Sequence, residues 1–481
     1  MNIKISALEY IDEIKNGNIT AEEFTAATID HIKKVDEKLH AFLDVNVDAV
    51  DKAREIDRKI KSGEKVGKFF GMPISIKDNI CIKESKTTCG SLMLQDFVAP
   101  YDATVISKLK NEDAIFVGKT NLDEFAMGLT TEFSAYGPSK NPWNTEYVPG
   151  GSSGGSAVAV GAYECTASLG SDTGGSVRNP ASFCGIVGYK PTYGLISRYG
   201  LVSYANSIEQ IGPMTRTVKD CAFMLNEITG EDPNDNTTVD SSKQDFLSNI
   251  DTGIEGKKIG LIKEMTGEGI DSSVLSATKD AVSKLEGLGA TCDDVSLDMV
   301  KYSVASYYTI TATEAGSNLA RYDNLRYGYD FSLEGYEFNS YISKARQKFG
   351  PEVTRRMILG GFVPSAGHAG KYFMKAVKVK SRLTDEINEA FKKFDYLIAP
   401  TVPILPFKIG EKIDDPIALF LVDINTVTAN LTGVPAISVP FAVSNGLPIG
   451  MQLFAKPMED KSLLQAAFSL ESTVKLPEVP I

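Results

Sequence analysis

The chain has 481 residues, of which 43% are hydrophobic, and this composition predicts a globular protein with a large buried core. The formal net charge of −12 argues against direct capture of a nucleic acid backbone by this chain alone. The six cysteines lack C-x-x-C spacing, the N-terminal segment has no apolar signal region, and no uncharged apolar stretch reaches the roughly 20 residues of a membrane span, so we expect reduced thiols in a cytoplasmic protein.

The first 65 residues are predicted to form helices. Thr20 and Glu23 match a capping box, and apolar residues then recur at helical spacing. A second helix is predicted over about 47–62. Because this segment carries no catalytic pattern, we divide the chain into a helical N-terminal arm, residues 1–65, for packing or partner binding, and a catalytic domain, residues 66–481.

Beyond the arm, short apolar strands alternate with helices, which is typical of an α/β domain. The predicted elements, in chain order, are a strand ending at Lys77, a helix over 101–110, a strand over 114–120, a helix over 121–128, a βαβ unit over 257–297, a mostly helical segment over about 301–395, and C-terminal strands with a hairpin turn at Asn445-Gly446. We therefore expect one large α/β domain whose central mixed, mostly parallel β-sheet is flanked by helices.

The glycine- and serine-rich segment 148–157 fits several known patterns poorly. It lacks the lysine of a P-loop, and no strand precedes it as a Rossmann fingerprint requires. A flexible linker is disfavoured because an apolar run follows directly. Residues 150–154 match the G-x-S-x-G nucleophile elbow of α/β-hydrolases, but the preceding segment is a poor strand and His368 is the only downstream histidine. The elbow stays open as a less favoured alternative.

A second glycine-flanked serine, Ser176, is predicted to lie near Ser152. A helix of about 9 residues after Gly155 travels ~14 Å, and the strand that follows returns a similar distance at ~3.3 Å per residue. The glycines let the backbone turn sharply and aim N–H groups inward. The N–H groups from Thr173 to Ser176 are therefore a candidate oxyanion hole for acyl transfer.

Histidine is the usual proton acceptor for a catalytic serine, but the chain has only three histidines, so we look for a different base for Ser176. A lysine serves as a base when burial lowers its pKa, since desolvation disfavours the ammonium form. Lys77 ends an apolar strand, where its side chain points either to solvent or into a polar site. We choose Lys77 as the candidate base because no other base for Ser176 is evident.

These residues lie in three segments that resemble the amidase signature family, and the resemblance is strongest over about residues 70–215. The resemblance implies a triad in which Ser176 is the nucleophile, Ser152 on a cis peptide bond is the proton relay, and Lys77 is the base. The spacing agrees, with 75 residues from Lys77 to Ser152 and 24 more to Ser176. The segments that carry the resemblance are 71–80, 148–157 and 170–194.

The same resemblance places an oxyanion hole on the backbone of three consecutive residues, Thr173, Gly174 and Gly175. It leaves Ser153 and Ser156, the other serines of the glycine-rich segment, as structural residues.

Within the family, the chain most resembles the A subunits of tRNA-dependent amidotransferases, on the segments 121–128, 136–144, 190–222 and 314–328. That resemblance implies hydrolysis of glutamine to glutamate and ammonia, and a heterotrimer with the B and C subunits. The B subunit then amidates misacylated Glu-tRNA(Gln) or Asp-tRNA(Asn) with ATP and Mg²⁺, and it contacts most of the tRNA. No metal or cofactor is expected on this chain itself.

Three further residues match positions that hold glutamine in that group. The α-carboxylate of glutamine needs a cation, which Arg356 supplies, and its α-ammonium needs an anion, which Asp423 supplies. Tyr307 is expected to line the same pocket. The alternatives are that Arg355 or Arg356 is an ordinary charge on a helix surface and that Asp423 caps a helix.

The sequence departs from the A-subunit pattern at several positions. Leu129 and Phe133 change a segment expected to form the pocket wall, segment 360–376 lacks the usual tyrosines, and Glu209 replaces an aspartate. These changes keep open a stand-alone amidase acting on small or aryl amides. A catalytically silent subunit is disfavoured because Lys77, Ser152 and Ser176 are all present.

Overall fold

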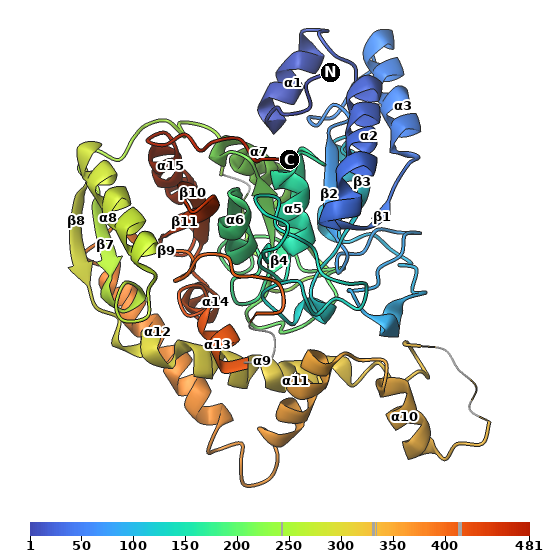
Figure 1. Cartoon of the computed structure of the whole chain (residues 1–481), viewed down its shortest axis with the longest axis vertical. Helices are drawn as coiled ribbons and strands as arrows, with labels where there is room; N and C mark the ends of the chain where they lie inside the picture. The colour runs from blue at the N-terminus through green and yellow to red at the C-terminus, as the bar shows by residue number, and fades with distance from the viewer. Residues whose placement is uncertain (242–243, 330–331, 333, 412–415) are drawn as a thin grey trace.

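A computed structural model of the chain describes residues 1–241, 244–329, 332, 334–411 and 416–481. Within this part of the chain, the strands form one 11-stranded sheet in the order β1-β3-β2-β4-β6-β5-β10-β11-β9-β7-β8 (Figure 1). The strands are β1 (Phe42–Val45), β2 (Pro73–Lys77), β3 (Ile115–Thr120), β4 (Ala167–Asp172), β5 (Val187–Lys190), β6 (Gln210–Thr215), β7 (Lys258–Ile262), β8 (Thr291–Val295), β9 (Tyr396–Pro400), β10 (Ala436–Ser444) and β11 (Leu447–Phe454).

The sheet is mixed, as predicted, but it contains fewer parallel pairs than expected. Strand β2 runs parallel to β3 and β4, and β7 runs parallel to β8 and β9. The other pairings among the described strands are antiparallel. One of these is the hairpin of β10 and β11, whose turn residues Asn445 and Gly446 both have positive φ, as the sequence predicts for this dipeptide.

Helices cover both faces of the sheet. On β9, Tyr396 and Ile398 belong to one hydrophobic cluster and Leu397 and Ala399 to a second, because alternate strand residues point to opposite faces. The helices are α1 (Ala7–Lys15), α2 (Ala21–Leu39), α3 (Ala49–Ser62), α4 (Thr104–Asn111), α5 (Gly154–Gly161), α6 (Arg178–Cys184), α7 (Val218–Ile228), α8 (Ser272–Gly287), α9 (Ser303–Leu319), α10 (Phe338–Arg346), α11 (Pro351–Phe362), α12 (Phe373–Ala390), α13 (Pro416–Leu421), α14 (Val427–Thr432) and α15 (Asp460–Glu471).

The N-terminal arm contains the predicted helices and one strand that was not predicted. Helix α2 begins with the predicted capping box of Thr20 and Glu23. Strand β1 then pairs antiparallel with β3, so the arm forms one edge of the main sheet. The two ends of the chain lie close together, where Lys4 and Glu478 form an ion pair at 2.9 Å (Figure 1). The helical segment predicted over 301–395 corresponds to α9–α12, of which α10 projects from the rest of the molecule (Figure 1).

The helix predicted over 121–128 is wrong, because only a 3₁₀ turn, η2 (Glu124–Ala126), forms there. Phe125 and Ala126 have positive φ, which ends any helix. Asp123 accepts hydrogen bonds from the backbone N–H groups of Thr131 (2.9 Å) and Phe133 (3.1 Å), so the chain folds back instead of continuing.

All six cysteines are free thiols, as predicted. Among the described helices, none combines the length and the apolar character that crossing a membrane requires.

Candidate active site

Lys77 is the last residue of β2, and its side chain is fully buried. Because β2 is parallel to β4, the carboxyl ends of the two strands meet at the same edge of the sheet. Residues that follow β4 therefore approach Lys77, as the sequence predicts.

The Lys77 amine lies among three hydroxyl groups. Its Nζ is 2.8 Å from Ser152 Oγ, 2.9 Å from Ser153 Oγ and 2.9 Å from Ser171 Oγ. Burial lowers the pKa of the Lys77 ammonium to about 7, against the opposing charges of Asp123 and Asp172. A substantial fraction of the amine is therefore neutral near pH 7 and able to accept a proton.

Ser152 is better placed to donate its proton to Lys77 than Ser153 is. The Ser153 hydroxyl donates to the Ser171 carbonyl (3.2 Å) and accepts from the Ser171 N–H (3.3 Å), so its proton is already committed. Ser171 Oγ accepts from Asn79 Nδ2 at 2.9 Å. Among the described residues, Ser152 Oγ has a hydrogen-bond partner only in Lys77. Sequence reasoning assigned no contact with Lys77 to Ser153 or Ser171.

Ser176 lies in the loop between β4 and α6 and is 7% exposed. Its carbonyl accepts the Ser153 N–H at 3.1 Å, which joins this loop to the segment that contains Ser152. The Gly151–Ser152 peptide bond is cis. The structure thus brings the Lys77 amine to the Ser152 hydroxyl and the backbone of Ser176 to the segment of Ser152, from three separate segments of the chain.

The predicted oxyanion-hole residues differ in how their N–H groups are used. The N–H of Gly175 donates to Asp172 Oδ1 at 2.9 Å and is therefore occupied. Among the described residues, the N–H groups of Gly174 and Ser176 have no acceptor, which leaves them available to a substrate oxyanion. A Cβ on Gly174 would lie 2.5 Å from Tyr307 Oη, so Tyr307 packs directly against this loop.

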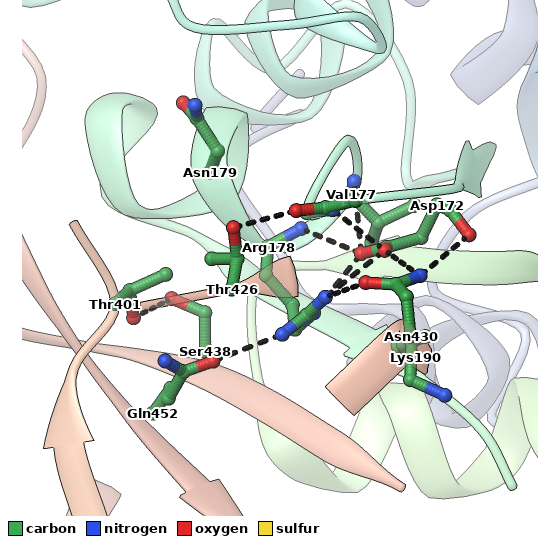
Figure 2. A network of polar contacts seen from close by, with 12 residues as sticks. Asp172, Val177, Arg178, Asn179, Lys190, Thr401, Thr426, Asn430, Ser438 and Gln452 are labelled. Carbon is green, nitrogen blue, oxygen red and sulfur yellow. Dashed lines mark hydrogen bonds and ion pairs between the residues drawn. The ribbon is translucent and has the colours of Figure 1, made fainter. Parts of the chain in front are cut away.

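A buried ion pair of Arg178 and Asp172 joins residues on either side of Ser176, and Figure 2 shows the network around this pair. Arg178 Nε and Nη2 each donate to Asp172 at 3.0 Å, and further donations reach Asn430 (2.7 Å) and Gln452 (3.0 Å). Burial opposes ionisation of Asp172, but the charge and hydrogen bonds of Arg178 outweigh it and lower the pKa of Asp172 to about 2. Asp172 is thus a permanent anion that fixes the backbone on both sides of Ser176.

Arg356 lies in α11 and is buried, which excludes the alternative of a surface charge. Its Nε donates to Glu352 at 2.7 Å, its Nη1 donates to the Tyr204 hydroxyl, and its guanidinium lies 5.1 Å from the Tyr308 ring centroid. Arg355 is more exposed and pairs with the same Glu352 carboxylate. Of these contacts, only Glu352 could be linked to Arg356 from the sequence, because the two residues are four apart on one helix. No local pattern links Tyr204 or Tyr308 to Arg356.

Asp423 is buried, and its side chain does not cap a helix. Its carboxylate accepts from Asn179 Nδ2 at 3.5 Å. Burial raises the pKa of Asp423 to about 7, despite the Asn179 hydrogen bond and the charge of Arg356. Thr426, three residues further on, donates to the Gly174 carbonyl at 2.6 Å, so the segment of Asp423 packs on the loop of Ser176.

Leu129 and Phe133, two of the departures from the A-subunit pattern, belong to one small apolar cluster, Leu129 inside it and Phe133 packed against it. Leu129 packs in a small apolar cluster with Phe183 and Phe407. Phe133 borders a cavity of about 500 Å³ together with Glu352 and Arg355.

Glu209 and His368, which the sequence also singled out, have defined contacts in the structure. Buried Glu209 accepts from the N–H groups of Tyr204 and Ala205, each at 3.0 Å. His368 packs against Phe362 and Tyr372 between α11 and α12, and the described residues between β3 and Ser152 contain no strand that leads into Ser152, so the nucleophile-elbow alternative is wrong.

The site combines a buried amine, glycine-flanked serines and backbone N–H groups without an acceptor among the described residues. A serine-dependent amide hydrolase needs these groups as base, nucleophile and oxyanion hole. Residues 23–464 match the family model described as Amidase, and the chain belongs to that family. It is 65% identical, over 99% of its length and 98% of the relative's, to the A subunit of the glutamyl-tRNA(Gln) amidotransferase of Cenarchaeum symbiosum. It is 48% identical to the protein of the same name from Carboxydothermus hydrogenoformans, over 98% of this chain and 97% of that one.

Among solved structures, the chain resembles the crystal structure of the A subunit of glutamyl-tRNA(Gln) amidotransferase from Thermotoga maritima. The TM-score is 0.83 at 42% sequence identity, and the match covers 100% of this chain and 98% of that one. Within the amidase family, the chain therefore falls among the proteins that carry this subunit name.

Proposed function

We propose that this chain is the glutaminase subunit of a tRNA-dependent amidotransferase and hydrolyses glutamine to glutamate and ammonia. The observation that carries the proposal is the buried Lys77 amine, 2.8 Å from Ser152 Oγ, with a pKa of about 7. A lysine with the ordinary pKa near 10.4 is charged at neutral pH and accepts no proton.

In the proposed reaction, neutral Lys77 takes a proton from Ser152 as Ser152 takes one from Ser176. Ser176 Oγ attacks the side-chain amide carbon of glutamine, and the N–H groups of the loop hold the oxyanion. The C–N bond breaks, the nitrogen receives the proton back through Ser152, and ammonia leaves. Water, deprotonated through the same relay, hydrolyses the glutamyl ester and restores Ser176.

Glutamine is proposed as the substrate because two opposite charges are buried near Ser176. Arg356 is the proposed partner of the α-carboxylate and Asp423 of the α-ammonium, and Tyr307, which packs against the Gly174 backbone, is proposed to line the same pocket. A zwitterionic amino-acid amide carries one negative and one positive group, so it is a suitable ligand for a site that presents both a guanidinium and a carboxylate.

The ammonia is proposed to pass to a partner, the B subunit, which uses ATP and Mg²⁺ to amidate Glu-tRNA(Gln) or Asp-tRNA(Asn). The chain is proposed to act in the cytoplasm in a heterotrimer with the B and C subunits. Its net charge of −12 favours leaving most tRNA contacts to the B subunit. The relatives carry the name of one component of an amidotransferase, which supports this assembly.

A second candidate is a stand-alone amidase that acts on small or aryl amides. The observation that favours it is Phe133, which borders the 500 Å³ cavity beside Arg355 and offers an apolar wall to an aromatic amide. This candidate predicts turnover without partners and little preference for glutamine over an anilide.

Ser176→Ala tests the proposal in the assembled complex. We expect the variant to lose glutamine hydrolysis while the complex still amidates misacylated tRNA when ammonium chloride replaces glutamine. Loss of the ammonia-dependent reaction as well would show that this chain has a different role. Rapid anilide hydrolysis by the isolated wild-type chain would instead favour the second candidate.

A further inference from the structure

Asn179 is a buried amide whose hydrogen-bonding capacity is mostly unused. It lies in the first turn of α6 and is 0% exposed. Its Nδ2 donates to Asp423 Oδ1 at 3.5 Å, whereas its Oδ1 has no partner among the described residues. Buried side-chain acceptors are nearly always paired, so an unpaired oxygen here calls for a donor that arrives with a ligand.

The position of Asn179 relies on the helix that follows Ser176. Asn179 comes three residues after Ser176, and one helical turn of this length advances ~4.5 Å. A Cβ on Gly150 would lie 2.5 Å from Asn179 Oδ1, so the amide also packs against the segment that leads to Ser152. Figure 2 shows the Asn179 side chain pointing away from the network of Asp172 and Arg178. Its surroundings are therefore the Ser152 segment on one side and Asp423 on the other.

The backbone advance of ~4.5 Å from Ser176 to Asn179 is comparable to the length of the proposed substrate. In glutamine, four single bonds of ~1.5 Å separate the reacting amide carbon from the α-nitrogen, which gives a span of roughly 5 Å. An α-ammonium has three N–H donors, and Asp423 alone leaves at least one of them without an acceptor. Asn179 Oδ1 is a neutral acceptor beside Asp423.

We infer that Asn179 is a specificity-determining residue, whose Oδ1 accepts a hydrogen bond from the α-ammonium of the substrate while its Nδ2 orients Asp423. The inference rests on the proposed function and adds a second acceptor to the ammonium site. It also explains how the site discriminates, since an amide without an α-ammonium leaves Asn179 Oδ1 unpaired in a buried site.

The test compares two substrates in the assembled complex: L-glutamine, and glutaramate, which has hydrogen in place of the α-amino group. For Asn179→Leu, which removes both polar atoms at similar volume, we expect kcat/KM for glutamine to fall about 30-fold, mainly through KM. For glutaramate we expect no fall, because that substrate makes no bond to Asn179. Asn388→Leu, on the exposed face of α12, is the matched control and should change neither value.

An equal loss for both substrates would overturn the inference, because Asn179 would then only position the Ser152 segment. An unchanged KM for glutamine would overturn it as well. Asn179→Ser, which is smaller, gives the same comparison should the leucine variant not fold, as judged by its thermal melt. The wild-type complex separates the two proposals: no hydrolysis of glutamine would contradict the proposed function, whereas equal hydrolysis of glutamine and glutaramate would contradict only the inference, since no ammonium recognition would then exist.

Discussion

Ser153 donates its backbone N–H to the carbonyl of Ser176 at 3.1 Å, while its own hydroxyl is 2.9 Å from Lys77 Nζ. Ser153 thus joins the loop of the proposed nucleophile to the buried amine without offering a free proton. The neighbouring Ser152 is left to carry the proton. The two adjacent serines therefore have different roles, and only Ser152 is expected to transfer a proton.

Substitution of the two serines should have very different effects on glutamine hydrolysis. We expect Ser152→Ala to lower kcat about 10³-fold, because it removes the relay between Lys77 and Ser176. Ser153→Ala keeps its backbone N–H and loses the hydroxyl's bonds to the Lys77 amine and to the Ser171 backbone, none of which carries the proton, so we expect a loss of about 10-fold or less. Initial rates of ammonia release measure both effects. If Ser153→Ala were the more defective variant, Ser153 would be the proton relay and Ser152 the structural residue.

Lys77→Met should abolish activity while the fold persists. Methionine fills a similar volume without a charge, so a fully buried site accepts it, but it takes no proton. We expect kcat to fall at least about 10³-fold. Circular dichroism and thermal melting check that the variant is folded. A folded variant with a tenth of the wild-type rate would remove Lys77 from the proposed role of base.

The pH profile should show two groups that must both be deprotonated. Neutral Lys77 and ionised Asp423 are the active forms, and the pKa of each is about 7, so activity is lost as the pH falls through 7. We therefore expect the logarithm of kcat/KM for glutamine to fall with a limiting slope near two below about pH 6 and to level off above about pH 8.

Asp423→Asn is the matching variant for this profile. It removes one of the two titrating groups, so the acidic limb should keep a slope near one, and KM at pH 8 should rise at least about 10-fold. An unchanged slope or an unaltered KM would place Asp423 outside the substrate site.

The buried pair of Asp172 and Arg178 should be important for stability as well as for activity. Arg178→Met leaves Asp172 without its guanidinium partner, and breaking a buried pair in this way costs about 3–5 kcal/mol. Urea unfolding measures the loss. The exposed pair of Lys392 and Glu389 supplies the control, since Lys392→Met should cost under about 1 kcal/mol. Similar losses for the two variants would show that the buried pair contributes little.

The main parts of the site could be found from the sequence because they lie in short segments, whose resemblance to the amidase signature family then implied the roles of Lys77, Ser152 and Ser176. An apolar strand ending in Lys77 and glycine-flanked Ser152 and Ser176 are visible in short segments, and the carboxyl ends of parallel strands bring them together. Asn430 and Gln452 were missed because they lie 252 and 274 residues from Arg178, and no local pattern connects them.

The turn at 121–128 was missed for a related reason. Its helical composition is overruled by the hydrogen bonds of Asp123 to a later loop, which only the folded chain supplies. The strand β1 is four residues long, too short for alternation to reveal it.

Strand β1 has a consequence for how the protein can be handled. It covers the outer side of β3, and a chain that lacks residues 1–65 would present an open row of backbone donors and acceptors on β3 to other molecules. Such a fragment would retain the serines and the lysine yet be prone to self-association through that exposed edge. The arm therefore covers a sheet edge that would otherwise promote aggregation. Tags or fusions should be placed so that they leave the arm intact.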